Sequence, residues 1–149
     1  MKAILTIGVS GSGKTTWAEQ FVKDSEEKWV NVNRDYIRLN LVSPGKTIKT
    51  YEFSRENESK VTEIQRVLIK EACINGENVI ISDTNLNSVF RKEIKEFLNS
   101  LGYDVEYKEF PIDHREAISR NFTRGDSSIP QHVLENQFNQ WHQYLGECK

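Results

Sequence analysis

A glycine-rich stretch near the N-terminus, Gly8–Thr15 (GVSGSGKT), has the residue types and spacing of a phosphate-binding loop. Glycines let backbone N–H groups approach phosphate oxygens closely, and a helix that follows adds its N-terminal dipole to the same anion. Lys14 can bridge the β- and γ-phosphates of a nucleotide, and the hydroxyl of Thr15 can ligate Mg²⁺. The predicted site for ATP and Mg²⁺ consists of Gly11, Ser12, Gly13, Lys14, Thr15 and Thr16.

A second group, Asp35 and Arg38, suits the acceptor side of a phosphoryl transfer. The two residues are three positions apart, so a short helix would place them on one face. A carboxylate is a weak base, but it can orient an attacking hydroxyl and accept its proton, and orientation matters most in a loose transition state. Helix capping by Asp35, with Arg38 as its solvated partner, is the structural alternative.

Three further side chains could complete such a site. Asp83 ends an apolar run, the usual place of a carboxylate that holds the Mg²⁺ shell or fixes an active-site arginine, although it could also cap a turn. Arg120 and Arg124 are four positions apart on one predicted helix face that ends at Gly125. They could close onto ATP phosphates, or they could simply be two arginines on an exposed helix.

The composition limits the classes of protein to which the chain can belong. With 149 residues, 37% hydrophobic and 28% charged, it resembles one ordinary soluble domain. No apolar run approaches the ~18 residues of a membrane span, and the apolar start leads into the glycine loop rather than a signal-peptide cleavage site. The formal net charge of −2 predicts at most a small, local contact with nucleic acid. Cys73 and Cys148 are expected as free thiols in a reducing cytoplasm, a host's cytoplasm if the chain is phage-encoded.

The hydrophobic pattern divides the chain into strands and helices. Predicted strands cover residues 3–9, 29–33, 78–83 and 103–110. Predicted helices begin at Lys14, span 35–41, 54–75, 87–101 and 113–124, and extend from Pro130, at a first-turn position, to Tyr144. Asn87 is an expected N-cap, and Asp113 with Glu116 forms an expected capping box. The buried face expected for the helix over 87–101 consists of Phe90, Ile94, Phe97, Leu98 and Leu101.

Strands that alternate with helices predict an α/β fold with right-handed crossovers. We expect a three-layer α/β/α P-loop kinase fold with a mostly parallel four-stranded sheet, in one domain over 1–149 with a helical lid at about 113–130. Ligands bind beyond the carboxyl ends of such strands. The residues that follow the second and third strands, 33–35 and 83–85, should therefore face the glycine loop.

The glycine loop predicts a nucleotide but does not identify an acceptor. A switch GTPase would carry an Asn-Lys-x-Asp tetrapeptide, which is absent, and motor ATPases are usually larger. The small size and the arginines after the fourth strand favour a small kinase. A small-molecule or nucleoside kinase that uses Asp35 and Arg38 on another alcohol, and a nucleotide-binding protein that switches shape with ATP, are the alternatives.

Four sequence blocks, at residues 8–17, 33–38, 80–87 and 120–125, together resemble the kinase domain of phage-type 5′-polynucleotide kinase. The blocks occur in order, and the resemblance extends to about Gly146. The glycine loop is shared by many kinases, whereas the DTNLN block at residues 83–87 and the RNxxRG block at residues 120–125 are more specific.

This resemblance implies ATP- and Mg²⁺-dependent phosphorylation of the 5′-hydroxyl ends of DNA or RNA. Asp35 would be the general base, and Arg38 would hold the 3′-phosphate of the acceptor. Asp83 and Thr84 would organise the acceptor side. The residues implied for the donor phosphates and the metal are Lys14, Thr15, Arg120 and Arg124.

Two departures from the family are visible. The phage enzyme continues into a 3′-phosphatase domain with an Asp-x-Asp-x-Thr motif, which this sequence lacks, so we expect a kinase only. The segment 51–58 (YEFSRENE) is more acidic than the acceptor side of that family.

Overall fold

The computed structural model of this chain describes residues 1–147, and the predicted thiol of Cys148 lies outside them. Its strands form one parallel sheet in the order β2-β3-β1-β4. Their bounds are β1 (Lys2–Ile7), β2 (Trp29–Val32), β3 (Asn78–Ile81) and β4 (Asp104–Glu109). The parallel register aligns Ala3 with Val79 on one side and with Val105 on the other. The predicted α/β class is confirmed, and every pairing in this sheet is parallel.

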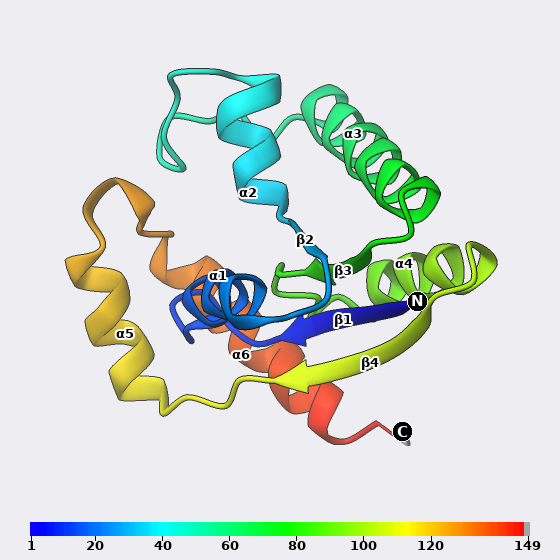
Figure 1. Cartoon of the computed structure of the whole chain (residues 1–149). Helices are drawn as coiled ribbons and strands as arrows, with labels where there is room; N and C mark the ends of the chain where they lie inside the picture. Colours follow the sequence, from blue (N-terminus) through cyan, green and yellow to red (C-terminus); the bar gives the residue numbers. More distant parts are fainter. Residues whose placement is uncertain (148–149) are drawn as a thin grey trace.

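Helices cover both faces of the sheet, which explains the continuous apolar runs in its central strands (Figure 1). Ile4 and Ile80 pack with Ala18 of α1 (Lys14–Asp24) in a small cluster on one face. On the other face, Leu5 and Ile81 join a larger cluster. That cluster is covered by α3 (Arg55–Ile74), α4 (Ser88–Ser100) and α6 (Gln131–Leu145). Side chains of β1 and β3 thus point alternately to the two faces, and the helices on both faces form the three predicted layers with the sheet.

Two short helical segments stand at the carboxyl ends of the strands. After β2, the helix α2 (Arg34–Ile37) continues into a π-helical turn, η1 (Arg38–Val42), where one helix over 35–41 was predicted. After β4, α5 (His114–Thr123) and the 3₁₀ turn η2 (Gly125–Ser127) form the segment predicted as a lid. The arrowheads of β1 and β4 point toward the side of the molecule where α5 lies (Figure 1).

The predicted buried face of α4 is wrong at its first residue. Phe90 is 67% exposed, whereas its neighbour Arg91 is only 4% exposed. Arg91 donates from Nη1 to the carbonyls of Asn85 (2.9 Å) and Leu86 (3.1 Å), and from Nη2 to both carboxylate oxygens of Glu147 (2.7 Å). These bonds satisfy a buried guanidinium, so a charged residue can replace the expected aromatic one. Phe90 lies in the first turn of α4 with its ring exposed.

Helix ends agree with the predictions in part. Asn87 caps α4 by accepting from the N–H groups of Val89 and Phe90, as expected. Asp113 accepts from the backbone of α5, but the Glu116 carboxylate pairs with Arg120 (2.7 Å), so only half of the predicted capping box forms. Pro130 is the N-cap of α6 and not a first-turn residue.

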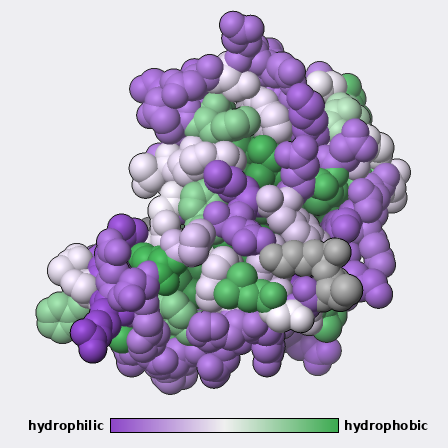
Figure 2. Space-filling view, turned by 90° about the horizontal axis from the view of Figure 1, so that it is seen from below, coloured by the Kyte–Doolittle hydropathy of each residue, from purple (hydrophilic) through white to green (hydrophobic). Residues whose placement is uncertain are grey.

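The face of the molecule seen from below (Figure 2) is predominantly polar. Figure 2 shows a face on which hydrophilic residues prevail and hydrophobic residues form separate patches. Within residues 1–147, no helix combines the length and hydrophobicity that a membrane crossing requires.

Candidate active site

The glycine loop joins β1 to α1 in a conformation that suits an anion. Gly11 and Gly13 have φ angles of +82° and +101°, which side chains rarely adopt. Gly13 is the N-cap of α1 and has no side chain to accept from the N–H groups of the first turn. These N–H groups and the helix dipole therefore face a cavity of about 620 Å³ that can receive phosphates.

Lys14 is folded into the glycine loop. Its side chain is buried, with Nζ donating to the carbonyl of Val9 (2.6 Å) and to Oγ of Ser12 (3.3 Å). Burial and the nearby positive charge of Arg124 lower the pKa of Lys14 to about 8. A phosphate in the loop would supply the negative charge that this buried ammonium group needs.

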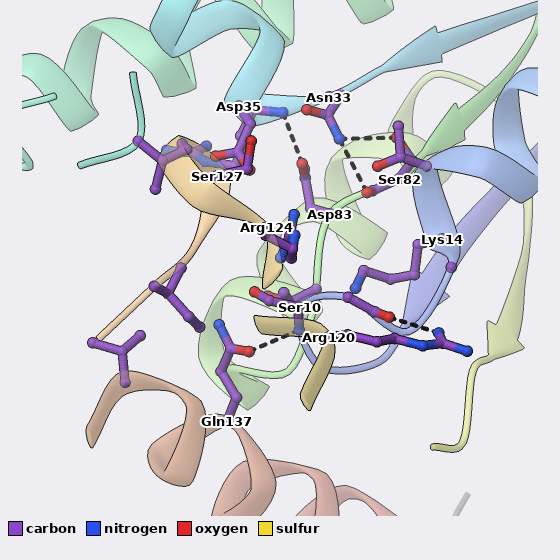
Figure 3. Close-up of a pocket in the computed structure, with 18 of the residues that line it drawn as sticks. Ser10, Lys14, Asn33, Asp35, Ser82, Asp83, Arg120, Arg124, Ser127 and Gln137 are labelled. Atoms are coloured by element: carbon purple, nitrogen blue, oxygen red, sulfur yellow. Dashed lines mark hydrogen bonds between the residues drawn. The ribbon is translucent and has the colours of Figure 1, made fainter. Parts of the chain in front are cut away.

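The predicted lid arginines lie beside the glycine loop (Figure 3). Arg120 donates from Nη1 to the carbonyl of Gly11 (2.9 Å) and from Nη2 to Glu116 (2.7 Å). Arg124 lines the same cavity and makes no ion pair with any residue in the described range 1–147. Its guanidinium is therefore available to an anionic ligand.

The acceptor side contains the expected Asp35–Arg38 pair. Arg38 donates from Nη1 to Oδ1 of Asp35 (2.8 Å), and Oδ2 of Asp35 has no hydrogen bond within residues 1–147. This oxygen can accept the proton of a hydroxyl that enters the cavity. The structural alternative for the cap is excluded, because Asn33 caps α2 by accepting from the N–H of Tyr36 (3.0 Å).

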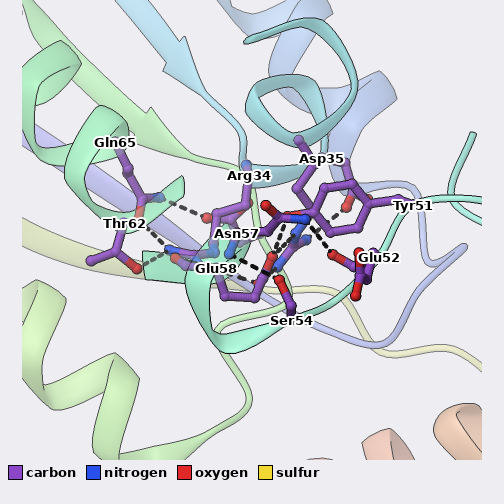
Figure 4. A network of polar contacts seen from close by, with 11 residues as sticks. Arg34, Asp35, Tyr51, Glu52, Ser54, Asn57, Glu58, Thr62 and Gln65 are labelled. Carbon is purple, nitrogen blue, oxygen red and sulfur yellow. Dashed lines mark hydrogen bonds and ion pairs between the residues drawn. The ribbon is translucent and has the colours of Figure 1, made fainter. Parts of the chain in front are cut away.

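Glu58 of α3, labelled in Figure 4, accepts from two further N–H donors of Arg38. The carboxylate of Glu58 accepts from Nε (3.1 Å) and Nη2 (2.5 Å) of Arg38, and the Tyr51 hydroxyl donates to it (2.7 Å). Burial disfavours the charged forms of Arg38 and Glu58, but the hydrogen bonds and the attraction between the two groups outweigh the effect of burial. The pKa of Arg38 is raised and the pKa of Glu58 is lowered, so both groups are charged near neutral pH. Phe53 covers the Arg38 guanidinium, with 5.0 Å between that group and the ring centre.

Asp83 organises this region by accepting from one backbone N–H and from one side-chain amide. Its Oδ1 accepts from the N–H of Arg34 (2.7 Å), and its Oδ2 accepts from the amide of Gln65 (2.9 Å). Asp83 therefore fixes Arg34 at its backbone, while the Arg34 guanidinium donates to Thr62 and Gln65. Burial raises the pKa of Asp83.

The structure brings all but one of the predicted residues to a single cavity. Its lining includes Gly11, Gly13, Lys14, Thr15, Thr16, Asp35, Arg38, Asp83, Thr84, Arg120 and Arg124. Ser12 is the exception, and its hydroxyl accepts from Nζ of Lys14 (3.3 Å). Thr84 joins the two halves, since its carbonyl accepts from the N–H of Gly8 (3.1 Å).

Several residues of the site were not predicted. Glu58 and Gln65 come from α3, far from the strand ends on which the prediction concentrated. Gln137 of α6 accepts from the N–H of Ser10 (2.8 Å) in the glycine loop. It lies in the apolar stripe of α6 between Leu134 and Phe138, and a polar residue in such a stripe is the signal that could have found it.

Oxygen donors in the cavity fit Mg²⁺. The Thr15 hydroxyl stands at the first turn of α1, and the carboxylates of Asp35 and Asp83 line the same space. Mg²⁺ is commonly held by few protein oxygens together with nucleotide phosphates. No group of three His, Cys, Asp or Glu that could hold a metal occurs in residues 1–147, so Thr15 would hold the ion with the help of the nucleotide.

Two curated relatives cover most of this chain. One is named "Putative bifunctional polynucleotide kinase/RNA ligase", from Autographa californica nuclear polyhedrosis virus, with 28% identity over 130 residues, 83% of this chain and 18% of the relative. The other is an L-seryl-tRNA(Sec) kinase from Methanococcus maripaludis, with 26% identity over 137 residues, 91% of this chain and 50% of the relative. The chain thus spans half or less of the length of each.

A solved structure and a family model agree with these similarities. A chain in a structure described as "Structure of the Pnkp1/Rnl/Hen1 RNA repair complex" superposes with a TM-score of 0.82 and 25% identity, over 99% of this chain and 46% of that one. The family model AAA_33, described as an AAA domain, matches residues 4–148. The match spans the glycine loop, the acceptor pair and the lid arginines, and the protein accordingly belongs to the AAA_33 family of P-loop kinase domains.

Proposed function

We propose that this protein transfers the γ-phosphate of ATP to the 5′-hydroxyl end of DNA or RNA. The observation that carries the proposal is the position of the Asp35–Arg38 pair, which faces the glycine loop across one cavity. A carboxylate for the acceptor proton and a cation for an acceptor phosphate thus stand opposite the cradle for the donor phosphates. The similarity to a polynucleotide kinase/RNA ligase and to a chain of an RNA repair complex supports this acceptor class.

On the donor side, the chain supplies positive charge to the phosphates. Lys14 would contact the β- and γ-phosphates, and Arg124 would neutralise charge that develops during transfer. Arg120 holds α5 against the loop through the carbonyl of Gly11. Bound Mg²⁺ would neutralise the phosphates further, with Thr15 as its protein ligand.

On the acceptor side, Asp35 would orient the 5′-hydroxyl in line with the γ-phosphate and accept its proton at Oδ2. Arg38 would bind the 3′-phosphate of the terminal nucleotide, because a guanidinium pairs with two phosphate oxygens at once. In the structure Glu58 holds these donors, so an acceptor phosphate must compete with or displace this carboxylate.

The pairing of Arg38 with Glu58 also favours a second candidate, a kinase for a nucleoside or another small uncharged alcohol. An arginine already neutralised by two carboxylates attracts a phosphate less strongly, and the acidic segment 51–58 lies beside it. The two candidate functions differ in whether the acceptor needs a 3′-phosphate.

One experiment separates the candidates. We would measure kcat/KM with adenosine and with adenosine 3′-monophosphate in the wild type, Arg38→Ala and Arg38→Lys. The wild type should prefer the 3′-phosphate by roughly 10- to 150-fold, which corresponds to a charged hydrogen bond of ~1.5–3 kcal/mol. Arg38→Ala should lose the preference, and Arg38→Lys should recover part of it because an ammonium group cannot form two parallel bonds. Equal use of both acceptors by the wild type would favour the small-molecule kinase.

A further inference from the structure

A second cavity, of about 810 Å³, opens between α3 and α4. It shares four lining residues with the candidate active site: Arg34, Arg38, Asp83 and Thr84. The two spaces therefore meet at the Arg38 guanidinium and at the loop that follows β3. We call the second space the α3–α4 groove.

The lining of the α3–α4 groove is suited to a flat aromatic ring. Phe90, the residue expected in the core, instead exposes 67% of its surface and lines the groove together with Leu86 and Ile94. An aromatic side chain held in the first turn of a helix is a rigid platform for stacking.

Polar groups in the same groove can read the edge of a base. Asn87 uses Oδ1 to cap α4, and its amide nitrogen has no partner within residues 1–147. Asn85 donates its side-chain amide to the carbonyls of Thr6 (2.8 Å) and Ile81 (3.0 Å) at a φ of +50°, and its side-chain Oδ1 has no hydrogen bond within residues 1–147. Amides with free donors and acceptors next to an aromatic platform fit the edge of a nucleobase.

The charges of the groove do not favour a long phosphate backbone. Arg55 and Arg66 line it together with Glu63 and Glu93, so these peripheral charges balance. A groove that bound many phosphates would carry an excess of positive charge. Its features favour one base over a run of phosphates.

The order of features follows the order of groups along a nucleic acid strand. Asp35 lies in the candidate active site, Arg38 at the boundary, and Phe90 in the groove beyond it. A strand whose 5′-hydroxyl meets Asp35 and whose first internucleotide phosphate meets Arg38 would direct its second nucleoside into the groove. We propose that the α3–α4 groove binds the second nucleotide of a single-stranded acceptor, with its base stacked on Phe90. This inference rests on the proposed function and specifies its substrate as an oligonucleotide with an unpaired second base.

The test compares two dinucleotide acceptors that differ only in the second base. Adenylyl-adenosine and its analogue with an abasic second residue carry the same 5′-hydroxyl and the same diester. In the wild type, kcat/KM should be higher for the complete dinucleotide by about 5- to 150-fold, the range that one stacked base supplies. Phe90→Ala should abolish this ratio, whereas Phe90→Trp should retain it.

Val89→Ala is the matched control, because Val89 is also an exposed residue in the first turn of α4 but does not line the groove. It should keep the wild-type ratio. Urea unfolding of each variant should be unchanged, since both side chains project from the surface.

A wild type that uses both dinucleotides equally, or a Phe90→Ala variant that keeps the ratio, would overturn the inference. If adenosine 3′-monophosphate is still phosphorylated in that case, the proposed function survives. If no 5′-hydroxyl acceptor is phosphorylated, both proposals fail. A dimer that Phe90→Ala dissociates without changing the ratio would assign the exposed ring to a contact between copies of this chain.

Discussion

The buried position of Lys14 predicts that ATP binding weakens as pH rises above about 8. The free protein holds Lys14 at a pKa of about 8, because the side chain is buried and Arg124 adds a like charge. Bound phosphates would raise this pKa, since they stabilise the ammonium form. Above pH 8, Lys14 is therefore mostly deprotonated in the free protein but protonated in the ATP complex. ATP binding is then accompanied by uptake of one proton from solution. Affinity falls with increasing pH because the competent, charged form becomes scarce.

The size of the effect follows from the fraction of Lys14 that stays charged. At about pH 9.5, roughly one molecule in 30 of the free protein would carry the proton, so the dissociation constant for ATP should be about 30-fold higher than near neutral pH. This factor corresponds to roughly 2 kcal/mol. Isothermal titration calorimetry over this range, in buffers of different ionisation enthalpy, measures both the affinity and the proton uptake.

Two variants identify the group. Lys14→Arg keeps its charge at every pH tested, so the pH dependence should disappear even though affinity is lower. Arg124→Gln removes the like charge, so the midpoint should move to a higher pH. An ATP affinity that is constant from neutral pH to about pH 9.5 in the wild type, or a midpoint that Arg124→Gln does not move upward, would refute this account.

Two further changes probe the acceptor side. Asp35→Asn should lower kcat by about 10²- to 10⁴-fold and leave the ATP dissociation constant nearly unchanged, because the carboxylate acts on the acceptor proton. Equal losses in steady-state rate and in ATP binding would assign Asp35 a structural role. Glu58→Gln should lower KM for adenosine 3′-monophosphate about fivefold, because a neutral amide competes for Arg38 about 1 kcal/mol less strongly than a carboxylate. A higher KM in this variant, measured by initial rates, would mean that Glu58 positions Arg38 and does not compete with the acceptor.

Much of the fold follows from local patterns. The apolar runs that predict β1 and β3 are visible in the sequence itself, and most side chains of these two strands, such as Leu5 and Ile80, are buried. Strand ends are less well defined, since β3 stops at Ile81, two residues before Asp83. Ser82 and Asp83 lie outside the strand, in a loop where Asn85 has a φ of +50° and donates to the carbonyls of Thr6 and Ile81. No periodic pattern encodes such a loop.

The glycine loop and the residues after the strands were predictable because their spacing along the chain is itself the signal. The residues that hydrogen-bond to these site residues could not be predicted. Gln65 holds Asp83 from 18 positions earlier, and Gln137 reaches Ser10 from the opposite end of the chain. In a single sequence each of these amides looks like any polar residue on a helix.

Phe90 and Arg91 show why an amphipathic pattern can mislead at a functional surface. Counting apolar positions assigns Phe90 to the core, because burial of an aromatic ring is normally favourable by a few kcal/mol. Arg91 takes the inward position because it meets two loop carbonyls and the Glu147 carboxylate, contacts that arise only once α6 and the loop after β3 are in place. The same loop begins at Asp83 and lines both the active site and the α3–α4 groove. Burial of Arg91 thus fixes the loop that shapes the acceptor side, and it turns Phe90 outward to the place where the second base of an acceptor would stack.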